Sequence, residues 1–221
     1  MNDNTTCAYV DWDERWRTET GPTDWVEPDE EVIERARAVH AAGARRALDL
    51  GCGIGRDNLA IANVGFEVDA FDVSQASLAK IAAQTERHDL SINTHRGYMN
   101  AQLFEEARND FIVSWSFFYR GGDAILRRAM ARIYRVLKTN GTMLLTMLSK
   151  RNVGFGVGRR DSTNFWVDPD AELDKAHAHC YYDAGEAIDL FDTFGIRSLV
   201  DIEQRGKSGY SHCYIVTERC A

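Results

Sequence analysis

Apolar and polar positions along this chain repeat in two patterns, one typical of helices and one typical of strands. In residues 30–42 the apolar side chains recur at helical spacing, and Gly43 stands where a helix would end. The next run, 44–50, is short and apolar, as expected of a buried strand. Because helical and strand patterns continue to alternate from here, the sequence predicts an α/β fold: a mostly parallel sheet with helices on both faces.

The same patterns assign the remaining elements. Further helices are expected at 58–65, 75–88, 122–138 and 184–195, and strands at 44–50, 66–73, 91–97, 110–117, 141–148, 197–204 and 212–219. Asn140 and Gly141 are expected to end the helix of 122–138. A short glycine-containing turn separates the last two strands, which predicts a C-terminal antiparallel hairpin. The sheet should therefore have seven strands.

The chain is expected to form a single domain, 1–221, since it contains no internal repeat or low-complexity tract. Two segments lie outside the alternating pattern. Residues 1–28 are expected to form an N-terminal cap segment. Residues 149–181 are polar and glycine-rich, and they are longer than the ~12 to 15 residues of an ordinary connection. Such connections are usually either lids or disordered, and we expect a lid insertion.

A glycine-rich turn follows the first strand, within the segment ALDLGCGIGRDN, 47–58. Its glycines run G-x-G-x-G, without the third glycine of the G-x-G-x-x-G pattern of dinucleotide-binding enzymes. The carboxylate of Asp49, two residues before the glycines, suits a ligand with an ammonium group and would repel a pyrophosphate. Asp72, at the end of the second strand, can accept hydrogen bonds from both hydroxyls of a ribose. Together the two acids indicate an adenosyl amino acid.

In these features the chain resembles the class I methyltransferases, which use S-adenosylmethionine (SAM) and release S-adenosylhomocysteine. Their first motif has the form acid-x-G-x-G-x-G, and their second strand ends in an acid. The resemblance implies a Rossmann-like fold. The acid that this class commonly carries after the third strand is replaced here by Tyr98. The residues that the resemblance places at the donor are Asp49, Gly51, Cys52, Gly53, Gly55, Asp72, Val73, Met99, Ser114 and Trp115.

Within this class the chain is most similar to the tellurite-resistance and thiopurine-type methyltransferases of small molecules. The segment WDERWRTETGPTDWVEP, 12–28, resembles their W-D-x-R-W…T-x-W opening, which folds over donor and acceptor. The resemblance implies that Trp16, Arg17 and Trp25 close the site. Alternatively, Trp12 and Trp16, four residues apart, only pin an amphipathic helix to the body. Both interpretations remain open at this point.

Composition bears on the methyl acceptor. Thirty-four acidic residues against twenty-six basic ones give a net charge of −8, which disfavours nucleic acid. The segment SWSFFYRGG, 114–122, also lacks the N-P-P-Y signature of nucleobase amino-group methylation. No apolar run approaches the ~20 residues that span a bilayer, and the acidic N-terminus lacks the features of a secretory signal. We therefore expect a cytoplasmic enzyme with a small-molecule acceptor and no membrane partner. A tRNA- or protein-directed enzyme and a non-catalytic SAM-binding module are the alternatives.

Methyl transfer is an in-line displacement that mainly requires alignment of the nucleophile and exclusion of water, so no obligatory base is expected. Arg160, in the 149–181 insertion, could bind an anionic acceptor. His179, Tyr181 and His212 stand at the edges of elements expected to face the same rim, where they could serve as proton acceptors. His177 and His179 lack a convincing third ligand, so no metal is expected. The five cysteines are odd in number and scattered, which favours free thiols.

Overall fold

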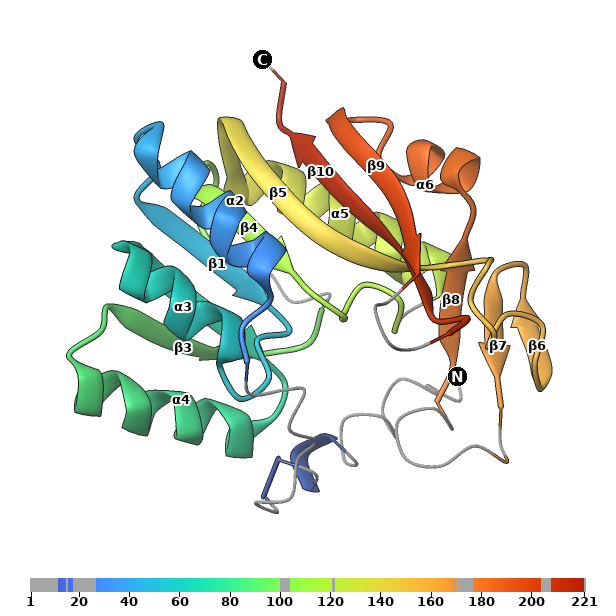
Figure 1. Cartoon of the computed structure of the whole chain (residues 1–221), viewed down its shortest axis with the longest axis horizontal. Helices are drawn as coiled ribbons and strands as arrows, with labels where there is room; N and C mark the ends of the chain where they lie inside the picture. Colours follow the sequence, from blue (N-terminus) through green and yellow to red (C-terminus); the bar gives the residue numbers. More distant parts are fainter. Residues whose placement is uncertain are drawn as a thin grey trace.

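The computed structural model describes residues 12–14, 16–17, 27–99, 104–120, 122–168, 170, 177–203 and 208–220. A twisted sheet forms the centre of the molecule (Figure 1). Seven strands follow one another across it in the order β3 (Ile92–Arg96), β2 (Glu67–Asp72), β1 (Arg46–Leu50), β4 (Asn109–Ser114), β5 (Leu137–Ser149), β10 (Ser211–Glu218) and β9 (Gly195–Glu203). The first five are parallel, whereas β10 is antiparallel to both β5 and β9. The predicted α/β fold and its C-terminal hairpin are confirmed.

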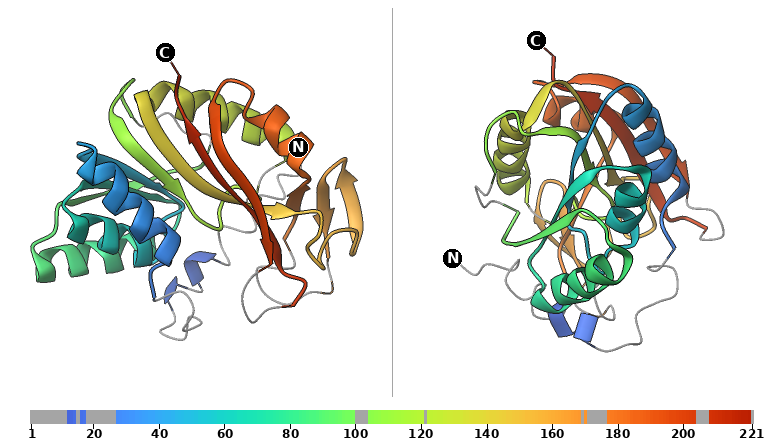
Figure 2. Two further views of the ribbon diagram at one scale, coloured as in Figure 1. Left: turned by 45° about the horizontal axis from the view of Figure 1, so that its top comes forward. Right: turned by 90° about the vertical axis from the view of Figure 1, so that its left-hand side faces the viewer.

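Helices cover both faces of the sheet (Figure 2). One face carries α2 (Glu30–Ala41), α3 (Arg56–Val64) and α4 (Gln75–His88), and the other carries α5 (Asp123–Val136) and α6 (Ala184–Leu190). Successive side chains of a strand point to opposite faces, so Ala47 of β1 packs in the first apolar layer and Leu48 in the second. None of the described helices is long and apolar enough to cross a membrane.

The start of α4 is fixed by Ser74, which matters for the site described below. The hydroxyl oxygen of Ser74 accepts a hydrogen bond from the backbone N–H of Ser77 at 3.1 Å, as a helix N-cap does. The first turns of a helix leave backbone N–H groups without partners inside the helix. Those of α4 point toward the carboxyl end of β2.

The junction between α5 and β5 differs from the sequence prediction. The helix ends at Val136 and the strand begins at Leu137, so Asn140 and Gly141 lie within β5 and do not end the helix. Leu137 is fully buried, and the guanidinium of Arg219 donates hydrogen bonds to the carbonyls of Arg135 and Leu137 at 3.2 and 2.7 Å. The backbone N–H groups of Ala107 and Arg108 also donate to the carbonyls of Arg135 and Val136. The last helical carbonyls are thus satisfied from outside the helix, so no glycine cap is required.

The segment 149–181 contains strands that the sequence did not predict. The hairpin of β6 (Arg159–Ser162) and β7 (Phe165–Val167) leads to β8 (His179–Tyr182), which pairs with β7 and, in parallel, with the end of β5. The pairing of β4 with β5 ends at Ser114. Beyond that point β8 takes the place of β4 along the same edge of β5, while β10 pairs with the other edge, so Leu148 pairs with both β8 and β10. The sheet thus gains three strands beyond the expected seven. The described part of this insertion is an extension of the sheet.

Candidate active site

The turn after β1 has the conformation that its glycines allow. Gly51 has a φ of 78°, and a Cβ atom there would lie 2.4 Å from the ring of Phe117. Gly55, at the start of α3, has a φ of 97°, and a Cβ there would lie 2.8 Å from Ile81. An L side chain at either position would meet both backbone strain and a steric clash. The turn is therefore held tightly between β1, α3 and the segment that follows β4.

Asp72 fastens this turn to the end of β2. One carboxylate oxygen accepts a hydrogen bond from the backbone N–H of Gly53 at 2.9 Å, and the other accepts one from Ser74 at 2.9 Å. Burial raises the pKa of Asp72, although the backbone donors at Ser74 and Gly53 oppose the shift. A carboxylate has about four lone-pair sites, so both oxygens can accept further hydrogen bonds.

Asp49 is buried beneath the turn with a carboxylate oxygen that is not satisfied. The residue is 2% exposed, and its Oδ2 makes no hydrogen bond to any described residue. The pKa of Asp49 is raised well above its usual value, mainly by burial and to a lesser degree by the nearby carboxylate of Asp57. A buried carboxylate without a partner is costly unless a cation or hydrogen-bond donor approaches it. Asp49 is therefore suited to a positively charged ligand group.

A cleft with about 860 Å³ of empty space opens above these groups, at the carboxyl ends of β1, β2 and β4. Most of the donor residues expected from the sequence line it: Trp16, Asp49, Gly51, Cys52, Gly53, Asp72, Val73, Met99 and Trp115. Gly55 is outside the lining, at the start of α3. Ser114 is also outside it; it is fully buried, and its hydroxyl donates to the carbonyl of Leu50 at 3.1 Å. The expected Trp25 lies outside the described residues.

Sequence reasoning missed seven further lining residues: Trp12, Ile54, Arg56, Asp57, Ser116, Phe117 and Arg120. Arg56 and Asp57 open α3, where the pattern indicated only the start of a helix. The guanidinium of Arg120 lies 5.0 Å from the ring centre of Trp12 and 5.2 Å from that of Tyr119, which indicates cation–π contacts with both. The segment 114–122 contained no periodic signal that could have placed Arg120 in the cleft.

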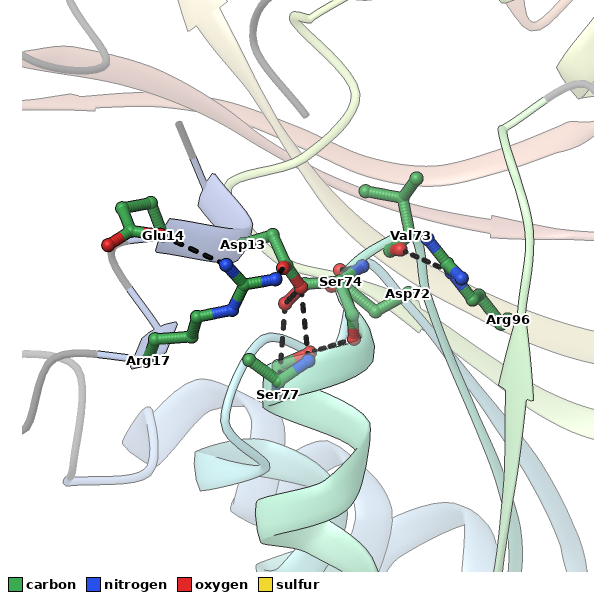
Figure 3. A network of polar contacts seen from close by, with 9 residues as sticks. Asp13, Glu14, Arg17, Asp72, Val73, Ser74, Ser77 and Arg96 are labelled. Atoms are coloured by element: carbon green, nitrogen blue, oxygen red, sulfur yellow. Dashed lines mark hydrogen bonds and ion pairs between the residues drawn. The ribbon is translucent and has the colours of Figure 1, made fainter. Parts of the chain in front are cut away.

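The N-terminal residues combine the two roles that the sequence left open. The rings of Trp12 and Trp16 lie 5.2 Å apart, and both line the cleft. Between them in the chain, Asp13 accepts hydrogen bonds from Ser74 and the backbone of Ala76, which attaches this segment to α4 (Figure 3). Arg17 is outside the lining and forms ion pairs with Asp13 and Glu14. The segment is thus both a wall of the cleft and a pinned element.

Three of the four catalytic candidates surround Tyr119, next to Arg120. The ring of His179 stacks on Tyr119 at 5.7 Å, and that of His212 meets it edge-on at 6.0 Å. Tyr181 is buried in the same small cluster, and burial raises its pKa to about 12. The fourth candidate, Arg160, is exposed on β6; it donates to the carbonyls of Ser162 and Thr163 and contacts the ring of Trp166. The structure does not bring Arg160 to the cleft.

The described cysteines are free thiols, and the described histidines belong to no metal-binding cluster. Cys52, Cys180, Cys213 and Cys220 are free thiols, as expected of these four described cysteines. Burial raises the pKa of Cys180 to about 12 and that of Cys213 to about 11, so both stay protonated at neutral pH. In the described part of the chain, no three His, Cys, Asp or Glu residues come together as a metal site.

The geometry of this site is that of a known domain type. The sequence pattern of the family described as "Methyltransferase domain" matches residues 47–141, somewhat less than half of the chain. Residues 47–141 are therefore similar in sequence to a methyltransferase domain. This methyltransferase domain begins in β1 and ends early in β5, so it contains the glycine turn, Asp49 and Asp72.

Two relatives are similar to the methyltransferase domain and its surroundings. Over 88 residues the chain is 33% identical to the probable S-adenosyl-L-methionine-dependent methyltransferase TehB of Haemophilus influenzae, covering 40% of this chain and 29% of TehB. Over 119 residues it is 32% identical to a putative methyltransferase of a Geobacillus species, covering 53% of this chain and 48% of that protein. The matches span less than half the length of either relative.

The similarity in fold extends beyond the methyltransferase domain. The chain aligns with the 1,6-didemethyltoxoflavin-N1-methyltransferase of Burkholderia thailandensis, whose structure holds 1,6-didemethyltoxoflavin and S-adenosylhomocysteine, with a TM-score of 0.73. The alignment covers 98% of this chain and 89% of that one at 18% identity. The shared architecture thus includes elements on both sides of residues 47–141.

Proposed function

We propose that this protein transfers a methyl group from SAM to a small-molecule acceptor. The observation that carries the proposal is the pair of acids in one cleft: Asp49 with a buried, unsatisfied oxygen, and Asp72 with accepting capacity left at the end of β2. The methyltransferase domain match supports the same conclusion. So does the resemblance to TehB, named a probable SAM-dependent enzyme.

The residues of the cleft fit the parts of SAM. Asp49 would attract the ammonium of the methionine portion, and the backbone of Gly51 and Gly53 would approach the donor closely. Asp72 would accept hydrogen bonds from the ribose hydroxyls. Val73 and Met99 supply apolar surface for the adenine. When bound, SAM supplies an electrophilic methyl group on a sulfonium, whose positive charge suits aromatic walls such as Trp16 and Trp115.

We place the acceptor toward Tyr119, at the end of the cleft where Arg120 lies. The donor-binding acids occupy the side of the cleft formed by β1 and β2, so the acceptor must enter from another side. Trp12, Phe117 and Arg120 line the cleft, and aromatic rings beside a guanidinium suit a small acceptor with an anionic group. The positive charge of Arg120 suits an acceptor with negative charge, and His179 and His212, whose rings contact Tyr119, are side chains of the type that takes a proton in acid–base catalysis.

Isothermal titration with SAM and S-adenosylhomocysteine tests the donor site. The wild-type protein should bind both, and Asp72→Ala should raise the dissociation constant of S-adenosylhomocysteine by ten- to a hundredfold, or about 1.4 to 2.7 kcal/mol, since hydrogen bonds to a carboxylate are lost. Glu67→Ala is the matched control, because Glu67 is at the opposite end of the same strand and pairs with Arg46 at the surface. Thermal unfolding of each variant checks that the fold is retained.

Activity is tested with SAM labelled in its methyl group and a panel of thiols, chalcogen oxyanions, phenols and amines. Transfer to at least one of these, weakened by Arg120→Ala more than by Arg160→Ala, is the expected result. Absence of binding of either SAM or its product would refute the proposal. Tight binding without transfer to any small molecule, nucleic acid or protein would instead identify a non-catalytic SAM-binding module.

A further inference from the structure

Asp13 connects the N-terminal segment to the helix that follows the donor-binding strand. Its Oδ1 accepts a hydrogen bond from the hydroxyl of Ser74 at 2.8 Å and another from the backbone N–H of Ala76 at 3.0 Å (Figure 3). These partners lie more than sixty residues away in the sequence. The carboxylate thus occupies the N-terminus of α4, where unpaired N–H groups and the helix dipole favour a negative charge.

The residues on either side of Asp13 form a wall of the cleft. Trp16 is 4% exposed, and a Cβ atom at Gly53 would lie 3.5 Å from its ring, so the indole packs directly over the glycine turn. Trp12 packs against Trp16, and the guanidinium of Arg120 lies over the ring of Trp12. Among the described residues, 12–14 and 16–17 are helical, which places both indoles on the side facing the cleft.

Ser74 joins this wall to the donor-binding acid. Its backbone N–H donates to Asp72 at 2.9 Å, and its hydroxyl donates to Asp13 while accepting from Ser77. Asp13 and Asp72 therefore hold the same residue from two sides, as Figure 3 shows. A displacement of the wall would therefore act on the segment that orients Asp72, and a displacement of Asp72 would act on the wall.

The charge of Asp13 suits it for this role. The backbone donor of Ala76, assisted by Ser74 and Arg17, lowers the pKa of Asp13, so the side chain is ionised at neutral pH. Its second oxygen pairs with Arg17 at 2.6 Å. Arg17 is itself exposed, so the ion pair mainly orients the carboxylate while the bonds to Ser74 and Ala76 make the attachment.

We propose that Asp13 is a positioning residue, which holds the Trp12–Trp16 wall over the cleft and so sets the affinity for the methyl donor. The inference rests on the proposed function, because it assumes that the cleft takes SAM. Asp13 lies outside the lining of the cleft and acts through the two tryptophans, which its hydrogen bonds to Ser74 and Ala76 hold in place. Its removal should weaken donor binding although every cleft-lining residue is retained.

The test compares three variants of the full chain in titrations with S-adenosylhomocysteine. Asp13→Ala should raise the dissociation constant about tenfold, since two hydrogen bonds to a charged group are lost. Asp13→Asn keeps an oxygen that can accept from Ser74 and Ala76, so it should stay within about threefold of wild type. Glu14→Ala is the control: among the described residues Glu14 also pairs with Arg17, in the same turn, but forms no hydrogen bond or ion pair with α4. The affinity of this variant should equal that of wild type.

A double-mutant cycle separates positioning from simple stabilisation. If Asp13 acts through the wall, Asp13→Ala should change affinity little in a Trp16→Ala background, because the wall is already lost. Additive losses, or equal affinity of Asp13→Ala and wild type, would overturn the inference. Failure of the wild-type protein to bind SAM and S-adenosylhomocysteine would instead refute the proposed function. Thermal unfolding of each variant confirms that the comparison is made between folded proteins.

Discussion

Asp49 shows how a single buried residue can lower the stability of the protein and favour ligand binding. The pattern of an acid two residues before a glycine turn was enough to propose it as a ligand for an ammonium. Its burial and its unsatisfied oxygen could not be predicted, since they depend on α3 packing over the end of β1. A carboxylate held this way destabilises the ligand-free protein and becomes favourable only when a positive group arrives. Such a conflict between stability and binding is typical of functional sites.

Asp49→Asn should therefore stabilise the ligand-free protein and weaken donor binding. Because the folded-state pKa of Asp49 is raised, wild-type stability falls as the pH rises above the ordinary aspartate value, and the asparagine variant avoids this loss. We expect a gain of about 1 to 3 kcal/mol at neutral pH, larger at pH 8 than at pH 5. Denaturant unfolding across this pH range, with and without S-adenosylhomocysteine, measures both effects. A variant that is less stable than wild type at pH 8 would contradict this account of Asp49.

At the scale of the elements, the sequence predicted the helices and strands whose bounds depend on local features. Helix α4 was predicted at its observed bounds because its apolar spacing and Ser74 cap are local features. The predicted end of α5 was wrong, because its last carbonyls accept hydrogen bonds from other parts of the chain: the backbone of Ala107 and Arg108, and the guanidinium of Arg219. Strand β6 has the sequence RRDS, with every side chain exposed, so it had no apolar alternation to reveal it. Distant partners decided the first case, and pairing within an exposed hairpin decided the second.

The role assigned to Arg219 can be tested by its removal. Arg219→Ala should lower the free energy of unfolding by about 1 to 2 kcal/mol, since the carbonyls of Arg135 and Leu137 lose a charged donor. The cation–π contact with Tyr134, at 4.8 Å, is lost as well. Arg197→Ala is the control, since Arg197 pairs with Glu218 at the surface and such pairs contribute little. Urea unfolding of the three proteins gives the comparison, and equal losses for both variants would exclude a special role for the α5–β5 junction.

At the scale of the whole molecule, the strand order explains why the sequence could bring Asp49 and Asp72 together but could not place the residues around Tyr119. Asp49 and Asp72 end neighbouring parallel strands, so a pattern of strand ends was sufficient to bring them together. Tyr119, His179 and His212 come from three separate parts of the chain and meet because β8 and β10 both pair with the end of β5. No periodicity in the sequence encodes that branch of the sheet. Arg160, which the sequence analysis offered for an anionic acceptor, is exposed on β6 and outside the lining of the cleft.

The same sheet depends on a buried polar group far from the cleft. Asp69 of β2 accepts hydrogen bonds from His95 of β3 at 2.8 Å and from Arg108, just before β4, at 2.9 Å. Burial alone would raise the pKa of Asp69, but the bonds from His95 and Arg108 outweigh it and the pKa is lowered. The stability contributed by this carboxylate is therefore present above the unfolded aspartate pKa of about 3.9 and is lost as the pH falls through the lower folded-state value.

Asp69→Asn should lower the free energy of unfolding at pH 7 by about 2 to 3 kcal/mol, because charged hydrogen bonds across three segments become neutral ones. The variant should also lose less stability than wild type between pH 5 and pH 3, since it no longer takes up this proton. Denaturant unfolding in steps of pH measures both changes, and Asp89→Asn, in the turn after α4, serves as control for a general effect of charge. If the stabilities of wild type and Asp69→Asn fall in parallel over the acid range, Asp69 is not a source of the acid sensitivity. Because Asp69 lies outside the cleft, affinity for S-adenosylhomocysteine in the folded variant should be unchanged, which separates the stability of the sheet from the function of its carboxyl edge.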